Sequence, residues 1–120
     1  MSVGNIVPVD DKLRMAIVGV GRMGSIHART LAESPLIDVV AVVDSNAAVA
    51  AAIAAEVGAT PLHDLGEAGA AEGVEAWLVA TPTTLHPAHV RRALAAGLHV
   101  LCEKPLALDP AESEALGAAA

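Results

Sequence analysis

Hydrophobic and polar residues alternate along this chain in blocks that predict buried strands separated by helices. Mostly apolar runs at residues 13–18, 37–43, 76–80 and 98–102 have the length of strands that are buried on both faces. A shorter run at 60–62 contains Pro61, which favours the edge of a sheet. The intervening segments predict helices over residues 22–33, 46–57 and 86–96, and a weak helical turn over residues 64–71.

The alternation of strands and helices, with short links, is typical of right-handed parallel βαβ units. We therefore predict an α/β fold, a doubly wound parallel sheet of order 3-2-1-4-5. Its ligand crevice is expected at the carboxyl ends of the first and fourth strands. Residues 1–12 show no hydrophobic period and are expected to be a flexible tail, which leaves 13–120 as one domain.

Several residues have the character of helix caps. Asp44 or Ser45 is expected to cap the helix that starts at residue 46. Thr84 or His86 is expected to cap the later helix, which has Pro87 in its first turn.

Composition and charge exclude several kinds of partner. The chain has seven basic and fourteen acidic residues, and Arg91 and Arg92 form its only basic pair, so we expect no nucleic-acid partner. A single Cys rules out an internal disulfide and fits a reducing compartment. Neither a signal peptide nor an apolar run of membrane-spanning length is present, so we expect a cytoplasmic protein with no membrane partner.

The first strand runs directly into the pattern Gly-x-Gly-x-x-Gly and then a helix, which is the order used by dinucleotide-binding domains. Gly19 permits the tight turn out of the strand. Gly21 lets the backbone approach a pyrophosphate, and Gly24 lets the helix pack closely. Free N–H groups at the start of the helix would then face the phosphates.

Asp44 lies twenty positions after Gly24, at the end of the second strand. A dinucleotide site needs a carboxylate there to accept hydrogen bonds from the adenosine ribose. The same charge repels a 2′-phosphate, and neither Ser45 nor Asn46 offers a cation to bind one. The sequence thus predicts NAD rather than NADP. A helix cap is the alternative role of Asp44, and both roles can hold together.

Two further strands end in polar residues at the same predicted edge. Thr81 and Pro82 follow the fourth strand, where backbone groups would border the nicotinamide ribose; a plain strand-to-helix turn is the alternative. Glu103, Lys104 and Pro105 follow the fifth strand. A Lys there could hold a hydroxyl group and assist proton transfer, whereas an exposed turn with an ion pair is the alternative.

The histidines do not form a familiar metal-ligand set, so we predict no metal site. His27 and His86 are expected near helix N-termini that face the crevice, as supporting or capping residues. His89 lies one turn after His86. His63 and His99 are expected at the surface or at strand edges.

Four stretches together resemble the nucleotide-binding half of the Gfo/Idh/MocA oxidoreductases. They are Ala-Ile-Val-Gly-Val-Gly-Arg-Met-Gly-Ser-Ile-His at 16–27, Val-Val-Asp at 42–44, Ala-Thr-Pro-Thr-Thr-Leu-His at 80–86 and Gly-Leu-His-Val-Leu-Cys-Glu-Lys-Pro at 97–105. The Glu-Lys-Pro motif is the most specific of them. The resemblance implies a Rossmann domain of an enzyme that transfers hydride between NAD(P) and a sugar, inositol or related polyol.

The resemblance also assigns roles to individual residues. It places Thr81, Pro82 and His86 beside the nicotinamide, and Lys104 against the nicotinamide ribose and the substrate as the catalytic residue. Pro105 could follow a cis peptide bond that aims Lys104. The residues expected to bind the cofactor are Gly19, Gly21, Arg22, Met23, Gly24, Asp44, Ser45, Thr81, Pro82, His86, Glu103, Lys104 and Pro105.

In this family a second domain carries the catalytic His, most of the substrate pocket and the surface for homo-oligomers. We expect the chain to stop before that domain, and so to bind cofactor without turnover by itself. The alternative function is an NAD-sensing regulatory module, which needs the glycines and Asp44 but has no need for Lys104.

Overall fold

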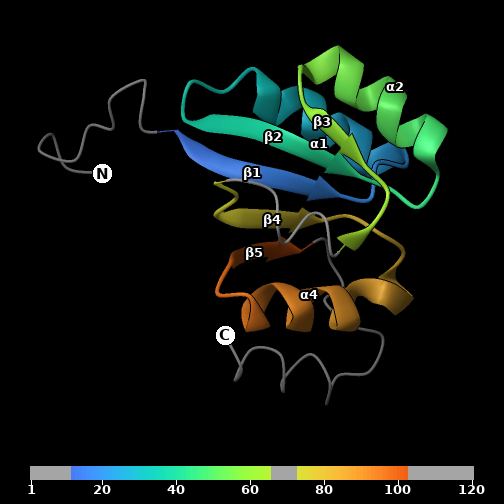
Figure 1. The fold of residues 1–120 in the computed structure, drawn as a ribbon, viewed down its shortest axis with the longest axis vertical. Helices are drawn as coiled ribbons and strands as arrows, with labels where there is room; N and C mark the ends of the chain where they lie inside the picture. Colours follow the sequence, from blue (N-terminus) through green and yellow to red (C-terminus); the bar gives the residue numbers. More distant parts are fainter. Residues whose placement is uncertain (1–11, 66–72, 103–120) are drawn as a thin grey trace, which may run out of the picture.

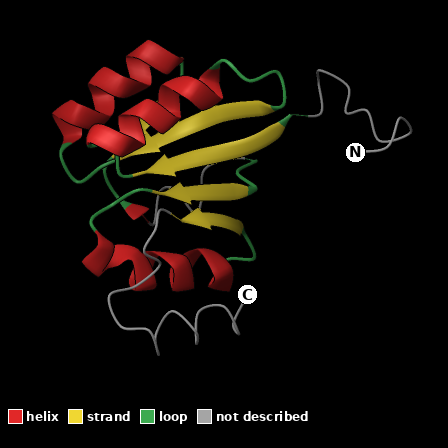
Figure 2. Cartoon of the chain, turned by 180° about the vertical axis from the view of Figure 1, so that it is seen from behind, coloured by secondary structure: helices red, strands yellow, loops and turns green. Residues whose placement is uncertain are grey.

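The computed structural model describes residues 12–65 and 73–102, which form one parallel sheet with helices on both faces (Figures 1 and 2). The predicted tail, most of the helical turn at 64–71, and the motif Glu103, Lys104 and Pro105 lie outside the described residues.

The sheet has the predicted order β3-β2-β1-β4-β5, and each of its four strand pairs is parallel. The strands are β1 (Leu13–Val18), β2 (Ile37–Val43), β3 (Thr60–Leu62), β4 (Ala76–Val79) and β5 (His99–Cys102). The carboxyl ends of β1 and β4 lie next to each other at the point where the strand order reverses. This arrangement confirms the doubly wound fold and the place of its crevice.

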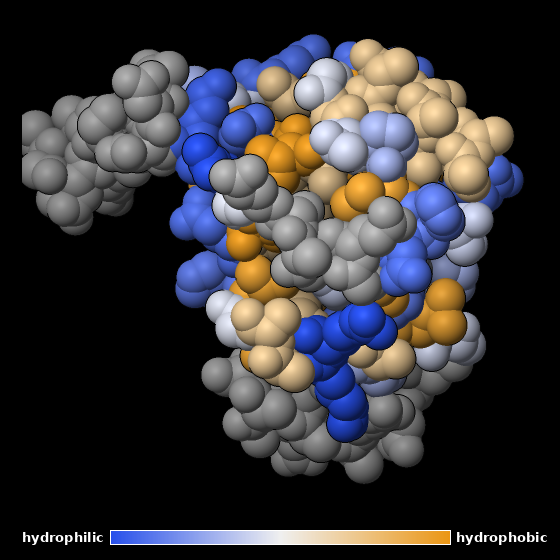
Figure 3. All heavy atoms as spheres, viewed as in Figure 1, coloured by the Kyte–Doolittle hydropathy of each residue, from blue (hydrophilic) through white to orange (hydrophobic). Residues whose placement is uncertain are grey.

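Three helices and one 3₁₀ turn connect the described strands. They are α1 (Arg22–Ala32), α2 (Ala47–Val57), η2 (Thr83–Leu85) and α4 (His86–Ala95). Helix α2 is built mostly of alanine, and its solvent side therefore shows as small, weakly apolar side chains in Figure 3. Positive φ angles at Gly58 and Gly97 turn the chain after α2 and α4.

Two apolar layers hold the helices on the sheet, one on each face. Ile17 and Leu78 lie in the layer beneath α1 and α2, with Ala28 and Ile53 from those helices. The other layer contains Trp77, together with Ala93 from α4. Small side chains on the helices let them approach the sheet closely, which compensates for the near absence of aromatic residues.

A bulge in β2 keeps the two layers consistent. Met15 pairs with Val39, but the next residue, Ala16, pairs with Ala41, so Val40 is an extra residue. In a regular strand Val39 and Ala41 would share one face, because side chains two residues apart point the same way; the bulge at Val40 places them on opposite faces. With it, Ala16 and Ala41 share one layer and Met15 and Val39 share the other.

The helix caps differ from the sequence prediction. Neither Asp44 nor Ser45 caps α2; the Asn46 side chain does, accepting hydrogen bonds from the N–H groups of Ala48 and Val49 at 3.1 and 3.3 Å. The chain bends at Ser45 and Asn46 before the helix begins, so the capping position falls on Asn46 rather than on Ser45.

The start of α4 differs as well. Neither Thr84 nor His86 caps it, because η2 precedes the helix and the capping position falls on Leu85, which offers no side-chain hydrogen bond. His86 is instead the first helical residue.

Ile17→Ala tests the core. Ile17 is 0% exposed on β1, the central strand of the sheet, so its truncation should lower the free energy of unfolding by about 2–5 kcal/mol. Urea unfolding, followed by the fluorescence of buried Trp77, measures the change. Ile26→Ala is the matched control, because Ile26 on α1 is 45% exposed and should change stability by less than about 0.5 kcal/mol. Equal losses in the two variants would contradict the assignment of the core.

Candidate functional site

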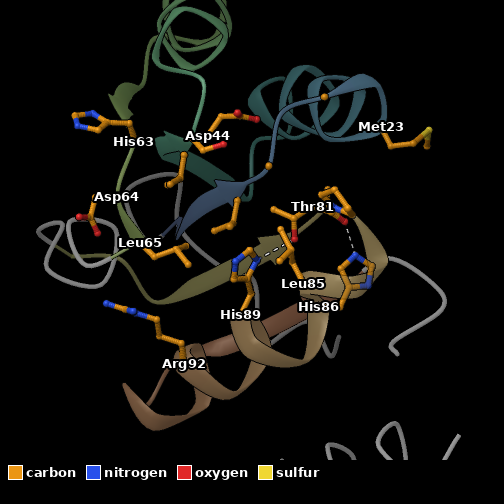
Figure 4. A pocket seen from close by; sticks show the side chains of 17 residues that line it. Met23, Asp44, His63, Asp64, Leu65, Thr81, Leu85, His86, His89 and Arg92 are labelled. Atoms are coloured by element: carbon orange, nitrogen blue, oxygen red, sulfur yellow. Dashed lines mark hydrogen bonds between the residues drawn. The ribbon is translucent and has the colours of Figure 1, made fainter. Parts of the chain in front are cut away.

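A cavity of about 910 Å³ opens at the carboxyl end of the sheet. Its walls come from the glycine turn after β1, the residues that follow β2, β3 and β4, and the first turns of α4 (Figure 4). The topology brings these segments together, because parallel strands end at the same edge of the sheet.

Gly19 makes the turn out of β1 with a φ of +90°, a conformation that favours glycine. Its N–H group donates to the carbonyl of Val43 at 2.7 Å, which ties the turn to the end of β2. A Cβ at this position would lie 2.7 Å from both Cγ2 and the backbone nitrogen of Thr81. Gly19 therefore allows the turn and the segment after β4 to pack together.

The other two glycines have distinct roles. A Cβ at Gly21 would meet nothing within 4 Å, so the space above it is open to a ligand. A Cβ at Gly24 would collide with the carbonyl of Gly19, so Gly24 lets α1 fold back against the turn. The Ser25 hydroxyl donates to the carbonyl of Val20 at 2.7 Å and holds the turn on the helix.

The N-terminus of α1 has the character of an anion site. Gly21 caps the helix without any side-chain hydrogen bond, and the first turn contains no acidic residue. The first N–H groups of the helix are thus not occupied by a capping side chain. Together with the helix dipole they favour a phosphate beside the open space at Gly21.

Asp44 joins the glycine turn to the end of β2. Its Oδ2 accepts a hydrogen bond from the N–H of Val20 at 3.0 Å, and its Oδ1 accepts one from the N–H of Asn46 at 2.9 Å. The carboxylate also lines the cavity, where each oxygen retains a further lone pair for a ligand hydroxyl. Asp44 is thus both a structural acceptor and a candidate ribose ligand.

Two histidines of α4 bind Thr81 on the opposite side of the cavity (Figure 4). Nε2 of His86 lies 2.6 Å from the carbonyl oxygen of Thr81, and Nδ1 of His89 lies 2.9 Å from the Thr81 hydroxyl. His86 is 1% exposed. Burial, and then the charges of His86 and Arg92, lower the pKa of His89 below its usual value.

The structure collects most of the sequence-predicted site into this one cavity. Predicted residues that line it are Gly19, Gly21, Met23, Asp44, Ser45, Thr81, Pro82 and His86. Arg22 is exposed and Gly24 is buried, and neither belongs to the lining. Glu103, Lys104 and Pro105 lie beyond the last described residue of β5.

Nine lining residues were not among the predicted binding residues. Three of them, Val18, Val43 and Ala80, are apolar residues at or directly after the ends of β1, β2 and β4; the others are His63, Asp64 and Leu65 after β3, and Leu85, His89 and Arg92 at the start of α4. His63 is exposed, as expected of a surface residue, but it forms part of the rim. The place of residues 63–65 directly after a parallel strand was the signal that could have found them.

Neither metal ligation nor membrane insertion is indicated within residues 12–65 and 73–102. This part of the chain contains no cluster of three His, Cys, Asp or Glu side chains able to hold a metal ion. Its helices are also too short or too polar to cross a bilayer.

Comparison with known proteins gives a consistent result. The family described as "Oxidoreductase family, NAD-binding Rossmann fold" matches residues 13–120. The inositol 2-dehydrogenase of Renibacterium salmoninarum is 42% identical over 102 residues, which cover 84% of this chain and 31% of that protein. The chain thus spans about a third of the length of that relative.

Solved structures share the fold. GenD2 from gentamicin A biosynthesis, in complex with NAD, has a TM-score of 0.87 and 37% identity, covering 96% of this chain and 34% of its own. KijD10, a 3-ketoreductase from Actinomadura kijaniata in complex with TDP-benzene and NADP, has a TM-score of 0.85 and 29% identity, covering 90% of this chain and 34% of its own. Related domains were thus solved with either cofactor.

Asp44→Asn tests the structural role of this carboxylate. An amide has only one acceptor oxygen, so one of the N–H groups of Val20 and Asn46 must face an NH₂ group. We expect urea unfolding to show a loss of about 1–3 kcal/mol. Asp38→Asn is the matched control, because Asp38 lies exposed on β2, the strand that Asp44 follows. A loss no larger than that of the control would contradict this role.

Proposed function

Because the chain belongs to the Gfo/Idh/MocA oxidoreductase family, we propose that it is the cofactor-binding half of a nicotinamide-dependent dehydrogenase. A bound nicotinamide would supply the hydride acceptor or donor. The residues of this chain would bind and orient the dinucleotide along the carboxyl edge of the sheet. The alternative of a non-catalytic NAD sensor has no observation in its favour.

The observation that carries this proposal is the hydrogen bond from Val20 to Asp44. It fixes a ribose-binding carboxylate next to the glycine turn, whose helix N-terminus is open to phosphate. A pyrophosphate beside Gly21 and a ribose beside Asp44 are the two recognition elements of a dinucleotide. Arg22, Met23 and Ser45 would complete this side of the site.

Asp44 also supports a preference for NAD. Its carboxylate would repel the 2′-phosphate of NADP, and Ser45 and Asn46 provide no positive charge to offset the repulsion. The two residues that follow Asp44 thus leave its negative charge dominant at the ribose.

The substrate is proposed to be a polyol or sugar of the inositol type, since relatives such as that of Renibacterium salmoninarum are named inositol 2-dehydrogenases. Lys104, between Glu103 and Pro105, would contact the nicotinamide ribose and the substrate and assist proton transfer. Thr81, Pro82 and His86 would form the nicotinamide side. The remaining substrate contacts, and the surface for a homo-oligomer, would come from a second domain of the full-length protein.

Cofactor titration of the full-length protein tests the NAD preference. NADH should bind more tightly than NADPH by at least about tenfold, equivalent to about 1.4 kcal/mol. Asp44→Ser should reduce this ratio, because it removes the repulsion of the 2′-phosphate. Fluorescence of the reduced nicotinamide measures both constants. NADPH binding as tight as NADH would exclude the assignment.

Lys104→Ala tests the catalytic proposal in the full-length protein, with NAD and a panel of inositols and aldoses. Loss of proton transfer should lower kcat by about 10²–10⁴-fold. NADH affinity should change by no more than about fivefold, the effect of one lost hydrogen bond to the ribose. Lys12→Ala is the matched control, because Lys12 precedes β1 and lies outside the cavity. Turnover near the wild-type rate would remove Lys104 from the mechanism.

A further inference from the structure

Thr81 is a lining residue whose carbonyl and hydroxyl are both held by α4. Its carbonyl accepts from His86 and its hydroxyl pairs with His89. Its Cγ2 packs so close to Gly19 that a Cβ at position 19 would lie only 2.7 Å from it. A change in the hydroxyl would therefore act next to the glycine turn.

The proton on His86 is fixed by chemistry. A carbonyl oxygen can only accept a hydrogen bond, so Nε2 of His86 must carry hydrogen and donate it to Thr81. The Thr81 carbonyl thus has a single hydrogen-bonding state. The remaining variable is the hydroxyl, which can either donate to His89 or accept from it.

The ionisation of His89 decides between these two states. An imidazole nitrogen is a much more basic acceptor than an alcohol oxygen, so a neutral His89 favours a bond donated by the Thr81 hydroxyl to Nδ1. The lowered pKa keeps His89 neutral at neutral pH. Protonation puts hydrogen on Nδ1 and reverses the bond, so that the hydroxyl must accept.

Other charged groups line the same cavity and bear on this equilibrium. On α4 these are His86 and Arg92, each three residues from His89, and both disfavour a positive charge there. Across the cavity, Asp44 follows β2, while His63 and Asp64 follow β3.

We propose that His89 is a positioning residue that makes the Thr81 hydroxyl an acceptor toward the nucleotide when neutral and reverses it when protonated. In the neutral state both lone pairs of the Thr81 oxygen are open to a ribose or amide donor of the bound dinucleotide, whereas protonated His89 takes one of them and the hydroxyl hydrogen must point elsewhere. This assignment rests on the proposed function, because it requires a dinucleotide in the cavity. It predicts that binding weakens only at a pH below the usual histidine range, because the pKa of His89 is lowered.

A double-mutant cycle on NADH affinity in the full-length protein tests the link between the two residues. Thr81→Val and His89→Leu should each raise the Kd about fivefold, the effect of one lost hydrogen bond. The double variant should also lose about fivefold rather than the ~25-fold of independent effects. Additive losses would overturn the proposal, because His89 would then act without Thr81.

The pH profile separates this role from a merely structural one. In the wild-type protein, NADH affinity should fall at low pH as His89 is protonated. This His89-dependent fall should be absent from Thr81→Val and from His89→Asn. His89→Asn should also recover affinity at neutral pH relative to His89→Leu, because its amide can again pair with the hydroxyl. His63→Asn measures how much of the acid loss of NADH affinity comes from His63, another histidine that lines the cavity. His99→Asn, on the exposed side of β5, is the matched control and should keep the wild-type profile. An unchanged acid loss in Thr81→Val would overturn the proposal.

Nitrogen-15 NMR of the histidine rings gives a readout that needs no cofactor. The proposal requires Nδ1 of His89 to be unprotonated at neutral pH; a proton on Nδ1 would overturn it even where NADH binds. Failure of the wild-type protein to bind either NADH or NADPH would instead overturn the proposed function, and this proposal with it.

Discussion

The hydrogen bond from the N–H of Val20 to the carboxylate of Asp44 is the constraint on which the site depends. It joins the end of β1 to the end of β2, and a second bond from Gly19 to Val43 lies beside it. Together these two bonds fix the position of the glycine turn relative to the carboxylate. The turn would bind the phosphates, and the carboxylate would bind the ribose. The carboxylate proposed to bind the ribose therefore also holds the loop proposed to bind the phosphates.

The sheet provides this geometry because side chains on each of its faces form one continuous apolar layer from strand to strand. The bulge at Val40 absorbs one extra residue, so that the side chains of β2 on either side of it share layers with their partners in β1. Parallel pairing then brings the ends of β1, β2, β3 and β4 to one edge. A residue that directly follows one of these strands therefore lies at the cavity whatever the structure of the rest of its loop.

The sequence predicted the strand order and the first side of the site, because continuous apolar runs and glycine spacing are local signals. Asp44 and Gly19 were found in this way, and the cavity brings them together as expected. The helix caps at Asn46 and Leu85 were missed, because a shift of one residue depends on the path of the chain rather than on composition. The bonds of His86 and His89 to Thr81 require tertiary structure, since neither spacing nor residue type specifies a ring nitrogen's partner. The role of Lys104 stays a prediction.

The contact between Gly19 and the segment after β4 limits how this turn can evolve. A Cβ at Gly19 would meet the Thr81 side chain, but it would also lie 2.7 Å from the backbone nitrogen of Thr81 and 2.9 Å from the carbonyl carbon of Ala80. A smaller side chain at position 81 removes only the first of these clashes. No second-site substitution at position 81 can therefore rescue a side chain at position 19, because the remaining clashes are with backbone atoms.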